Sequence, residues 1–212
     1  MKTENLIQAL SADLATRPTP VPRAIAQALI VSVPIALGLL FYVWQVRPDF
    51  WIVLSSTRFL FKFVFTVSVL GAGLWLVLRL TRPGTQAGPA ITALFVAGGL
   101  MLTAVVTELA VMPSSAWMSL LVGDMAGPCL LLIPVFSAAP LVALLYALKA
   151  GAPDDPKLAG AAAGLLAGGI GATIYASHCH NDSPLFVATW YIIALAAVTV
   201  IGRTLGGRML RW

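Results

Sequence analysis

The chain has 212 residues, of which 59% are hydrophobic and only 10% are charged, and its mean hydropathy is +0.93. This balance excludes an ordinary soluble globular domain and favours a protein that lies largely within a lipid bilayer. The formal net charge of +5 does not require a nucleic acid partner, because Lys and Arg also accumulate in the cytoplasmic loops of membrane proteins.

Six apolar stretches occupy most of the sequence. Each is close to the length of about 20 helical residues that crosses a hydrocarbon core roughly 30 Å thick. We expect transmembrane helices at residues 24–46, 59–78, 90–112, 128–148, 158–176 and 185–205. The sequence thus predicts an all-α polytopic membrane protein with an N-terminal tail (1–23), a six-helix domain (24–205) and a short basic C-terminal segment (206–212). Because this organisation leaves no room for a soluble catalytic domain, we do not expect an enzyme.

Lys and Arg are concentrated in segments that this topology brings to one side of the membrane. These segments are the N-terminal tail, the loops at 79–89 and 149–157, and the C-terminal segment. The loops predicted at 113–127 and 177–184 contain neither Lys nor Arg. Because basic residues in short loops stay in the cytoplasm, both termini are predicted to be cytoplasmic.

The N-terminal tail carries an amphipathic pattern. Leu6, Leu10 and Leu14 recur at four-residue spacing, and Ile7 lies beside them. This pattern predicts a short helix that ends before Pro18. Its polar face lacks the Lys and Arg that are typical of a helix bound to a membrane surface. We therefore favour a groove on a partner protein as the contact of its apolar face, with packing on the bilayer as the alternative.

The fifth span contains a row of small residues. Gly160, Gly164 and Gly168 repeat at four-residue spacing, and Ala172 continues the row. One face of this helix is therefore nearly bare backbone, which lets a neighbouring helix approach closely. We interpret the row as a packing surface.

Lys62 and Glu108 are charged residues that fall inside predicted spans. Lys62 lies about three residues from the outer end of the second span and Glu108 about four from the outer end of the third, so their depths differ by roughly 1.5 Å. On adjacent antiparallel helices, the two residues are predicted to form an ion pair. The alternatives are that each side chain reaches the outer interface separately, or that the two mark an ion or proton pathway.

Cys129 and Cys179 carry the most chemistry in the sequence, and both are expected at the outer face of the membrane. There they could form a disulfide or, together with His178, His180 and Asp182, bind a soft metal ion such as zinc or copper(I). The spacing is specific for neither. The alternative is a buried small hydrophobe at Cys129 and an interfacial thiol at Cys179. No resident cofactor is expected, and the donor set allows a transient soft metal ion at the two cysteines.

These features occur together in one known family. The shared motifs run from end to end: Met1-Lys2-Thr3 with Leu6-Ile7 and Leu10, Arg47-Pro48-Asp49, Gly127-Pro128-Cys129, Gly151-Ala152-Pro153, His178-Cys179 with Asp182-Ser183-Pro184, Phe186, Trp190-Tyr191 and Leu210-Arg211-Trp212. On these motifs the chain resembles the NrsF family of six-span inner-membrane anti-sigma factors, which are negative regulators of extracytoplasmic-function (ECF) sigma factors. At position 181 this chain has Asn where an acidic residue is expected in similar proteins. The claim that this loop supplies a second carboxylate ligand to a metal ion is therefore weaker.

The resemblance implies a bacterial inner-membrane protein whose partners are an ECF sigma factor and the lipid bilayer, with no direct nucleic acid partner and no small-molecule substrate. It implies that the apolar residues of the tail hold the sigma factor at the membrane. Because 23 residues are few to mask a sigma factor, we expect either that the second and fourth loops contribute or that the nearby membrane helps to occlude it. Cys129 and Cys179 are then expected to respond to heavy-metal or oxidative stress. The signal would alter the outer ends of the fourth and sixth spans, and helix movement would release the sigma factor.

Two other classes of protein compete with this interpretation. The first is a small inner-membrane transporter or metal permease, which could also use six spans and the loop with His and Cys. Pro134 and Pro140 would kink the fourth span of such a protein unless Ser137 or a neighbour compensates. The scarcity of polar groups in the spans and the lack of a repeated half-site speak against it. A membrane thiol oxidoreductase would need paired vicinal cysteines, and the sequence contains no CxxC motif.

Overall fold

The structure is a computed structural model that describes residues 3, 20–81, 88–151 and 153–211. Within these ranges the chain is helical and contains no strand. The predicted tail helix, with Leu6, Ile7, Leu10 and Leu14, lies outside the described residues. The loop predicted at 79–89 is described only in part.

Six segments of the described chain are long and apolar enough to cross a membrane, and they correspond to the six predicted spans. They are Val21–Trp44, Thr57–Leu80, Gly88–Val111, Ser114–Gly151, Pro156–Ala176 and Pro184–Met209. The boundaries differ most in the fourth segment, because short helices precede its main helix. These helices indicate a multi-pass, all-α membrane protein.

The elements follow one another as antiparallel helices with short connections. The first half contains α2 (Val21–Leu39), the π-helical turn η1 (Leu40–Trp44), α3 (Phe50–Val53), α4 (Thr57–Leu80) and α5 (Gly88–Val111). The fourth segment contains η2 (Ser114–Ala116), α6 (Trp117–Val122), α7 (Ala126–Leu148) and η3 (Lys149–Gly151). The remainder contains α8 (Pro156–Ala176), α9 (Pro184–Phe186), the π-helical turn η4 (Val187–Tyr191) and α10 (Ile192–Met209). Loops had been expected where α3 and α6 form.

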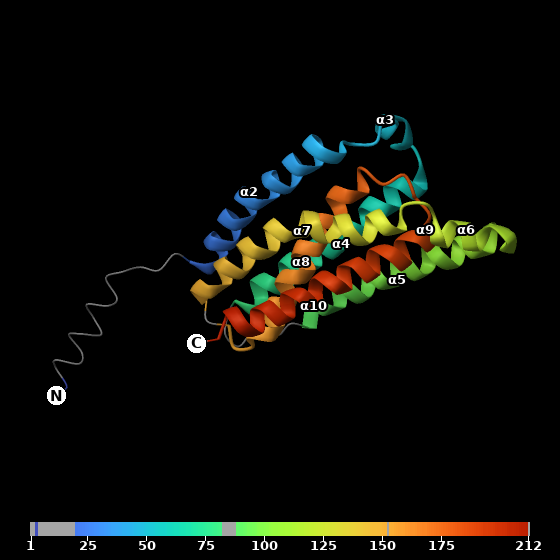
Figure 1. Cartoon of the computed structure of the whole chain (residues 1–212). Helices are drawn as coiled ribbons and strands as arrows, with labels where there is room; N and C mark the ends of the chain where they lie inside the picture. The colour runs from blue at the N-terminus through green and yellow to red at the C-terminus, as the bar shows by residue number, and fades with distance from the viewer. Residues whose placement is uncertain (1–2, 4–19, 82–87, 152, 212) are drawn as a thin grey trace.

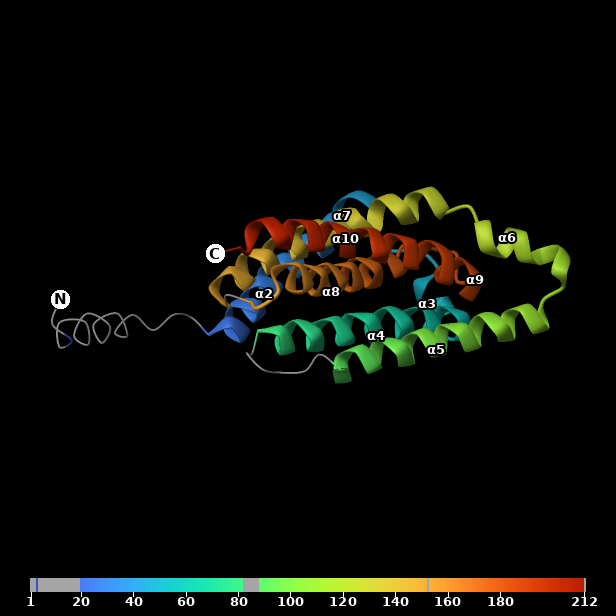
Figure 2. The same ribbon diagram turned by 90° about the horizontal axis from the view of Figure 1, so that it is seen from below.

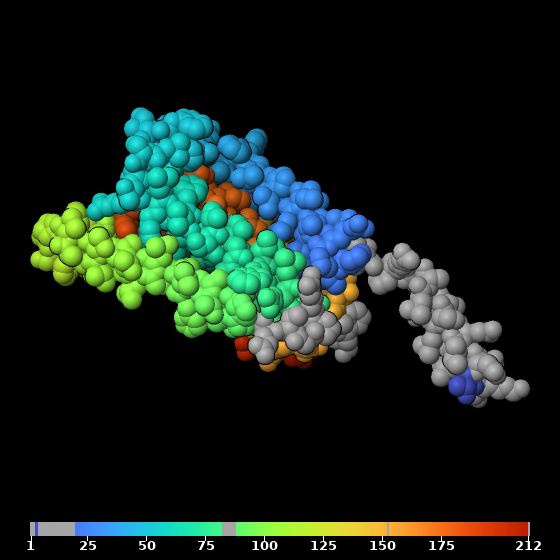
Figure 3. Space-filling model, turned by 180° about the vertical axis from the view of Figure 1, so that it is seen from behind, coloured from blue at the N-terminus to red at the C-terminus, as the bar shows by residue number. Residues whose placement is uncertain are grey.

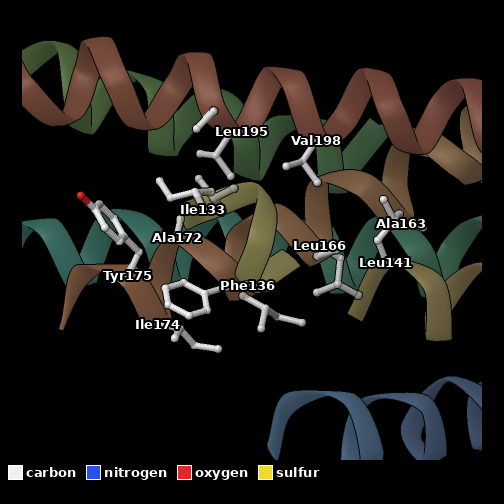
Figure 4. Packing of buried hydrophobic residues seen from close by; sticks show 14 of the residues in the cluster. Ile133, Phe136, Leu141, Ala163, Leu166, Ala172, Ile174, Tyr175, Leu195 and Val198 are labelled. Atoms are coloured by element: carbon white, nitrogen blue, oxygen red, sulfur yellow. The ribbon is translucent and has the colours of Figure 1, made fainter. Parts of the chain in front are cut away.

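The central helix of the bundle is α8. It packs against α10, α7 and α4, and Figure 2 shows it between α10 and α4. Most of its residues are buried, and Leu166 and Ala172 lie in the packed interior shown in Figure 4. Asp155 caps the start of the helix by accepting hydrogen bonds from the backbone N–H groups of Lys157 and Leu158.

The glycine row on α8 is a helix-packing surface, as predicted. A Cβ atom added at Gly164 would lie 2.6 Å from the carbonyl oxygen of Val198, and one added at Gly202 would lie 2.7 Å from the Cα atom of Gly164. Thus α8 and α10 meet backbone to backbone. On another side of α8, a Cβ atom added at Gly171 would lie 2.6 Å from the carbonyl oxygen of Ile133 on α7. Small residues therefore bring α8 close to its neighbours on more than one side.

Two prolines lie within α7, which continues through Pro134 and Pro140 without interruption. Ser137 donates a hydrogen bond to the carbonyl oxygen of Ile133 at 2.7 Å. The carbonyl oxygens that the prolines leave without a partner belong to residues four positions before each proline. The Ser137 bond therefore replaces neither missing bond, and packing of α7 against α8, α2 and α10 supports the helix instead.

Two long helices, α2 and α5, lie at the periphery of the bundle. The main neighbour of α2 is α7, whereas α5 packs on α4 and α9. Figure 3 shows α2 and α5 flanking α4, with part of α8 visible between α2 and α4. At one end of the bundle, called the terminal end here, α2 begins and α10 ends (Figure 1). The opposite end, called the cysteine end, holds residues 45–56 and 177–183 (Figure 1).

Candidate functional site

A partly buried segment connects α8 to α9 at the cysteine end. This Cys179 segment, residues 177–183, contains no helix, yet Cys179 is 0% exposed and Ser183 is buried. The segment is tied to the linker after η1, because the backbone N–H of Arg47 donates to the carbonyl oxygen of Ser177 at 3.1 Å. A buried connection of this kind depends on neighbouring groups to satisfy its polar atoms.

Three charged side chains lie beside the segment, and a fourth, Asp182, belongs to it. We call Arg47, Asp49, Lys62 and Asp182 the ion-pair cluster. Arg47 donates to Asp49 through Nε and Nη2, both at 2.7 Å, and to Asp182 through Nη1 at 2.8 Å. The Nζ atom of Lys62 binds the other carboxylate oxygen of Asp182. Two cations and two carboxylates balance, which compensates the complete burial of Lys62.

The two cations of the cluster also hold the backbone of Cys179. Lys62 Nζ donates to the carbonyl oxygen of Cys179 at 2.7 Å, and Arg47 Nη1 donates to the same oxygen at 3.4 Å. Both cations lie over the ring of Phe59, at 5.3 Å for Lys62 and 5.5 Å for Arg47. The position of Cys179 therefore depends both on α4, which carries Lys62, and on the linker after η1, which carries Arg47.

The contact between Arg47 and Asp49 keeps both groups charged. Hydrogen bonding to Arg47 lowers the pKa of Asp49 below its ordinary value. Hydrogen bonding to Asp49 raises the pKa of Arg47 above its ordinary value, although burial acts in the opposite direction. The pair is therefore fully ionised at neutral pH.

The predicted ion pair between Lys62 and Glu108 is wrong. Lys62 binds the ion-pair cluster, whereas Glu108 Oε1 lies 2.9 Å from Arg58 Nη2. The Oε2 atom of Glu108 accepts hydrogen bonds from Ser183 Oγ at 2.6 Å and from the backbone N–H of Leu185 at 3.0 Å. Equal depth did not decide the pairing, because the direction in which each side chain leaves its helix also matters. Glu108 instead holds the end of the Cys179 segment.

His178 and His180 have different partners. His178 Nδ1 lies 2.9 Å from the carbonyl oxygen of Gln45, and because a carbonyl can only accept, this nitrogen carries the proton. His180 Nε2 lies 2.8 Å from Asp124 Oδ2, in the connection between α6 and α7. The two histidines therefore fasten the Cys179 segment to two separate parts of the cysteine end.

Cys129 and Cys179 lie in one hydrophobic cluster and are both 0% exposed. They are free thiols. Tyr175 connects their surroundings. Its hydroxyl donates to the carbonyl oxygen of Met125 at 3.4 Å, and the backbone N–H of Cys129 donates to the same oxygen at 2.8 Å. The carbonyl oxygen of Tyr175 accepts from the backbone N–H of Cys179 at 3.0 Å. The fold thus brings together the two cysteines that lie far apart in the sequence.

The predicted sensing residues do not converge on one point. Within the described part of the chain, no group of three or more His, Cys, Asp and Glu side chains is arranged to hold a metal ion. Asp182 is engaged with the two cations of the cluster, and each histidine is engaged with the partner named above. The soft donors Cys129 and Cys179 are instead linked through the hydrogen bonds of Tyr175 to Met125 and to the backbone of Cys179.

Comparison with known proteins identifies the family. The sequence profile of NrsF, described as negative regulator of sigma F, matches residues 10–212. The chain belongs to the NrsF family. This confirms the resemblance drawn from the sequence motifs, and the NrsF family is a regulatory one rather than a family of enzymes.

Two NrsF relatives match over the full length of both chains. The chain is 35% identical over 216 residues to the "Probable anti-sigma-F factor NrsF" of Azospira oryzae. It is 34% identical over 215 residues to the "Anti-sigma-F factor NrsF" of Caulobacter vibrioides. Each alignment covers 100% of this chain and 100% of the relative. No solved structure matches the chain.

Three charged residues have contacts in the site for which the sequence had suggested no role. Arg47 and Asp49 belong to a motif shared with the NrsF family, but no function had been assigned to either. A signal was present, since two opposite charges flank a proline directly after the first span, and charged residues next to a membrane segment need partners. Arg58 had no assigned role either, although it is the partner of Glu108.

Proposed function

We propose that this protein is a membrane-bound anti-sigma factor that sequesters an ECF-type sigma factor at the cytoplasmic face of the bacterial inner membrane. The observation that carries the proposal is the match to the NrsF family over residues 10–212. The six membrane-spanning helices agree with it, since they leave little chain for anything other than anchoring, signal transfer and a short binding segment. In this proposal the domains are the tail (1–23), the transmembrane unit (24–205) and the basic C-terminus (206–212).

The sigma factor is proposed to bind at the terminal end of the bundle. Because α2 begins and α10 ends there, one orientation in the membrane puts the N-terminal tail and the basic C-terminus in the cytoplasm together. The apolar side chains Leu6, Ile7, Leu10 and Leu14 supply the groove-binding face. At this end α4 and α7 finish and α5 and α8 begin (Figure 2). The predicted loops at 79–89 and 149–157, which connect these helices, are proposed to extend the contact.

Release of the sigma factor is proposed to start at Cys129 and Cys179 on the periplasmic side, in response to heavy-metal or oxidative stress. Support comes from the burial of both thiols and from Tyr175, which hydrogen-bonds to Met125 beside Cys129 and to the backbone of Cys179. In this proposal the thiols react with the signal, while His178, His180 and Asp182 hold the segment that carries Cys179. A soft metal ion is bound transiently and is not a resident cofactor.

Co-purification with the cognate sigma factor tests the proposal. The detergent-solubilised protein is compared with two triple variants, one with Leu6, Leu10 and Leu14 replaced by Ala and one with Glu4, Gln8 and Ser11 replaced by Ala. The wild type and the second variant should retain the sigma factor, whereas the first should lose it because its apolar face is removed. Absence of a complex with folded wild-type protein would reject the anti-sigma role and favour a permease.

A further inference from the structure

The N-terminal tail is joined directly to α2, so the position of α2 determines where the tail begins. The main neighbour of α2 is α7. By contrast, α10 is locked to α8 by backbone contacts at Gly164 and Gly202, so those two helices move as one unit. Close packing therefore restrains α2 less than it restrains α8 and α10, and a movement of α2 would reach the tail.

The end of α2 remote from the tail is fastened to the Cys179 segment by three bonds of at most 3.1 Å and by a longer one of 3.4 Å from Arg47 Nη1 to the carbonyl oxygen of Cys179. The backbone N–H of Arg47 donates to Ser177 at 3.1 Å, and His178 Nδ1 donates to the carbonyl oxygen of Gln45 at 2.9 Å. The third bond is the ion pair of 2.8 Å between Arg47 and Asp182. Because Gln45 and Arg47 directly follow η1, these bonds act on the last turn of the helix.

The backbone at Gln45 is strained. Its φ of 62° and ψ of 161° lie in a region that residues other than glycine rarely adopt, and such a conformation persists only when the surroundings enforce it. On one side the backbone N–H of Gln45 donates to Leu40 at 2.6 Å, and on the other side the bonds of Arg47 and His178 hold the chain. Gln45 would relax if those bonds were lost.

Arg47 and Lys62 share the same acceptors but connect different helices. Lys62 lies on α4, which packs against α8, and it holds both Asp182 and the carbonyl oxygen of Cys179. Lys62 therefore keeps the Cys179 segment on the central helices, whereas Arg47 keeps the end of α2 on the segment. Removal of the Arg47 side chain leaves Asp182 paired with Lys62 and the segment in place. The backbone bond of Arg47 to Ser177 and the bond of His178 to Gln45 also remain, so the substitution removes only the charged contacts of α2 with the segment and weakens the attachment of α2 selectively.

We propose that Arg47 is the positioning residue through which the Cys179 segment controls α2 and, through α2, the tail. This inference rests on the proposed function. When the segment shifts, Arg47 loses its bonds to Asp182 and to the carbonyl oxygen of Cys179, the strained turn at Gln45 relaxes, and the tail is presented differently to the sigma factor. The proposal places the movement in α2 rather than in the fourth and sixth spans.

Hydrogen exchange in lipid nanodiscs tests the link without the sigma factor. Arg47→Gln is compared with Ser55→Ala, a control that removes an exposed hydrogen bond from the cysteine end and touches neither the ion-pair cluster nor Glu108. Arg47→Gln should raise amide exchange in residues 36–46 by about tenfold, because several hydrogen bonds to a charged group are lost. Exchange in α8 and α10 should stay at the wild-type rate, and Ser55→Ala should leave α2 unchanged.

Sigma-factor capture is then measured on the same three proteins. Arg47→Gln should retain about tenfold less sigma factor than the wild type, while Ser55→Ala should retain the wild-type amount. Unchanged exchange in α2 of Arg47→Gln, or an equal effect of both variants, would overturn the link. Wild-type protein that captures no sigma factor would instead overturn the proposed function. If Arg47→Gln does not fold, Arg47→Lys, which keeps the charge but loses the forked geometry, replaces it with the same criteria.

Discussion

Lys62 shows how a single buried charge shapes this protein. Its side chain is 0% exposed, and its ammonium group binds Asp182 and the carbonyl oxygen of Cys179 beside the ring of Phe59. Breaking a buried ion pair typically destabilises a protein by about 3–5 kcal/mol, because one charge is left without compensation. The partners of Lys62 are therefore as important for the cysteine end as its apolar packing.

A double-mutant cycle separates the observed pairing from the predicted one. Lys62→Met combined with Asp182→Asn should show a coupling energy above about 1 kcal/mol, because the two side chains are in contact. Lys62→Met combined with Glu108→Gln should be additive within roughly 0.5 kcal/mol. The free energy of unfolding in mixed detergent micelles provides the measurement. Strong coupling of Lys62 to Glu108 would contradict the pairing in the structure.

The two thiols should be protected at rest. Because Cys129 and Cys179 are both 0% exposed, their reaction with a small maleimide should be at least about 100-fold slower in the folded protein than after denaturation, since it requires local opening. Single Cys→Ser variants assign the signal to each thiol, and mass spectrometry follows the rate. Rapid labelling of either thiol in the folded protein would show that this thiol is accessible and not buried.

At the scale of elements, the bundle is organised around α8. Its small residues allow close approach of α10 and α7, and its burial follows from contacts on several sides. The long helices α2 and α5 are attached more loosely, chiefly to α7 and to α4. Close packing concentrates stability in the central helices, so that peripheral helices are better suited to movement.

Substitution of single glycines tests this organisation. Gly164→Ala should lower the free energy of unfolding by about 1–3 kcal/mol, because the new Cβ atom would lie 2.6 Å from the backbone of α10 and cannot be accommodated without a shift. Gly98→Ala is the matched control, since nothing lies within 4 Å of the added atom on the exposed face of α5. It should be neutral or stabilising by up to about 1 kcal/mol. Equal effects at both positions would argue against the α8–α10 contact.

At the scale of the whole molecule, the two ends of the bundle have different characters. The cysteine end holds the ion-pair cluster and a buried connection, whereas the terminal end holds the start of α2 and the end of α10. Arg23, Lys149, Lys157, Arg203, Arg208 and Arg211 are exposed in the segments near the terminal end. Exposed basic residues at one end favour an orientation with that end in the cytoplasm.

Reporter fusions measure this orientation. A phosphatase that is active only outside the cytoplasm should be active when fused after residue 55, at the cysteine end, and inactive when fused after residue 212. A cytoplasmic fluorescent reporter should give the reverse result, which controls for expression. Activity of the phosphatase at residue 212 would show that the C-terminus is not cytoplasmic.

The sequence by itself determined the number and approximate limits of the membrane spans, the packing role of the glycine row and the family. Each of these depends on local information: the length of an apolar run, the four-residue spacing of small residues, and short motifs. The short helices α3 and α6 were missed, because a few residues carry too little periodicity to distinguish a helix from a loop.

Only the tertiary structure decided which charges meet. The depth of Lys62 and Glu108 could be estimated from the sequence, but the rotation of each helix about its axis could not, and rotation selects the partner. The Cys179 segment folds back among the helices and brings Asp182 to Lys62 and Arg47. No local pattern specifies such a return, because its free energy comes from contacts between residues that are far apart in the chain.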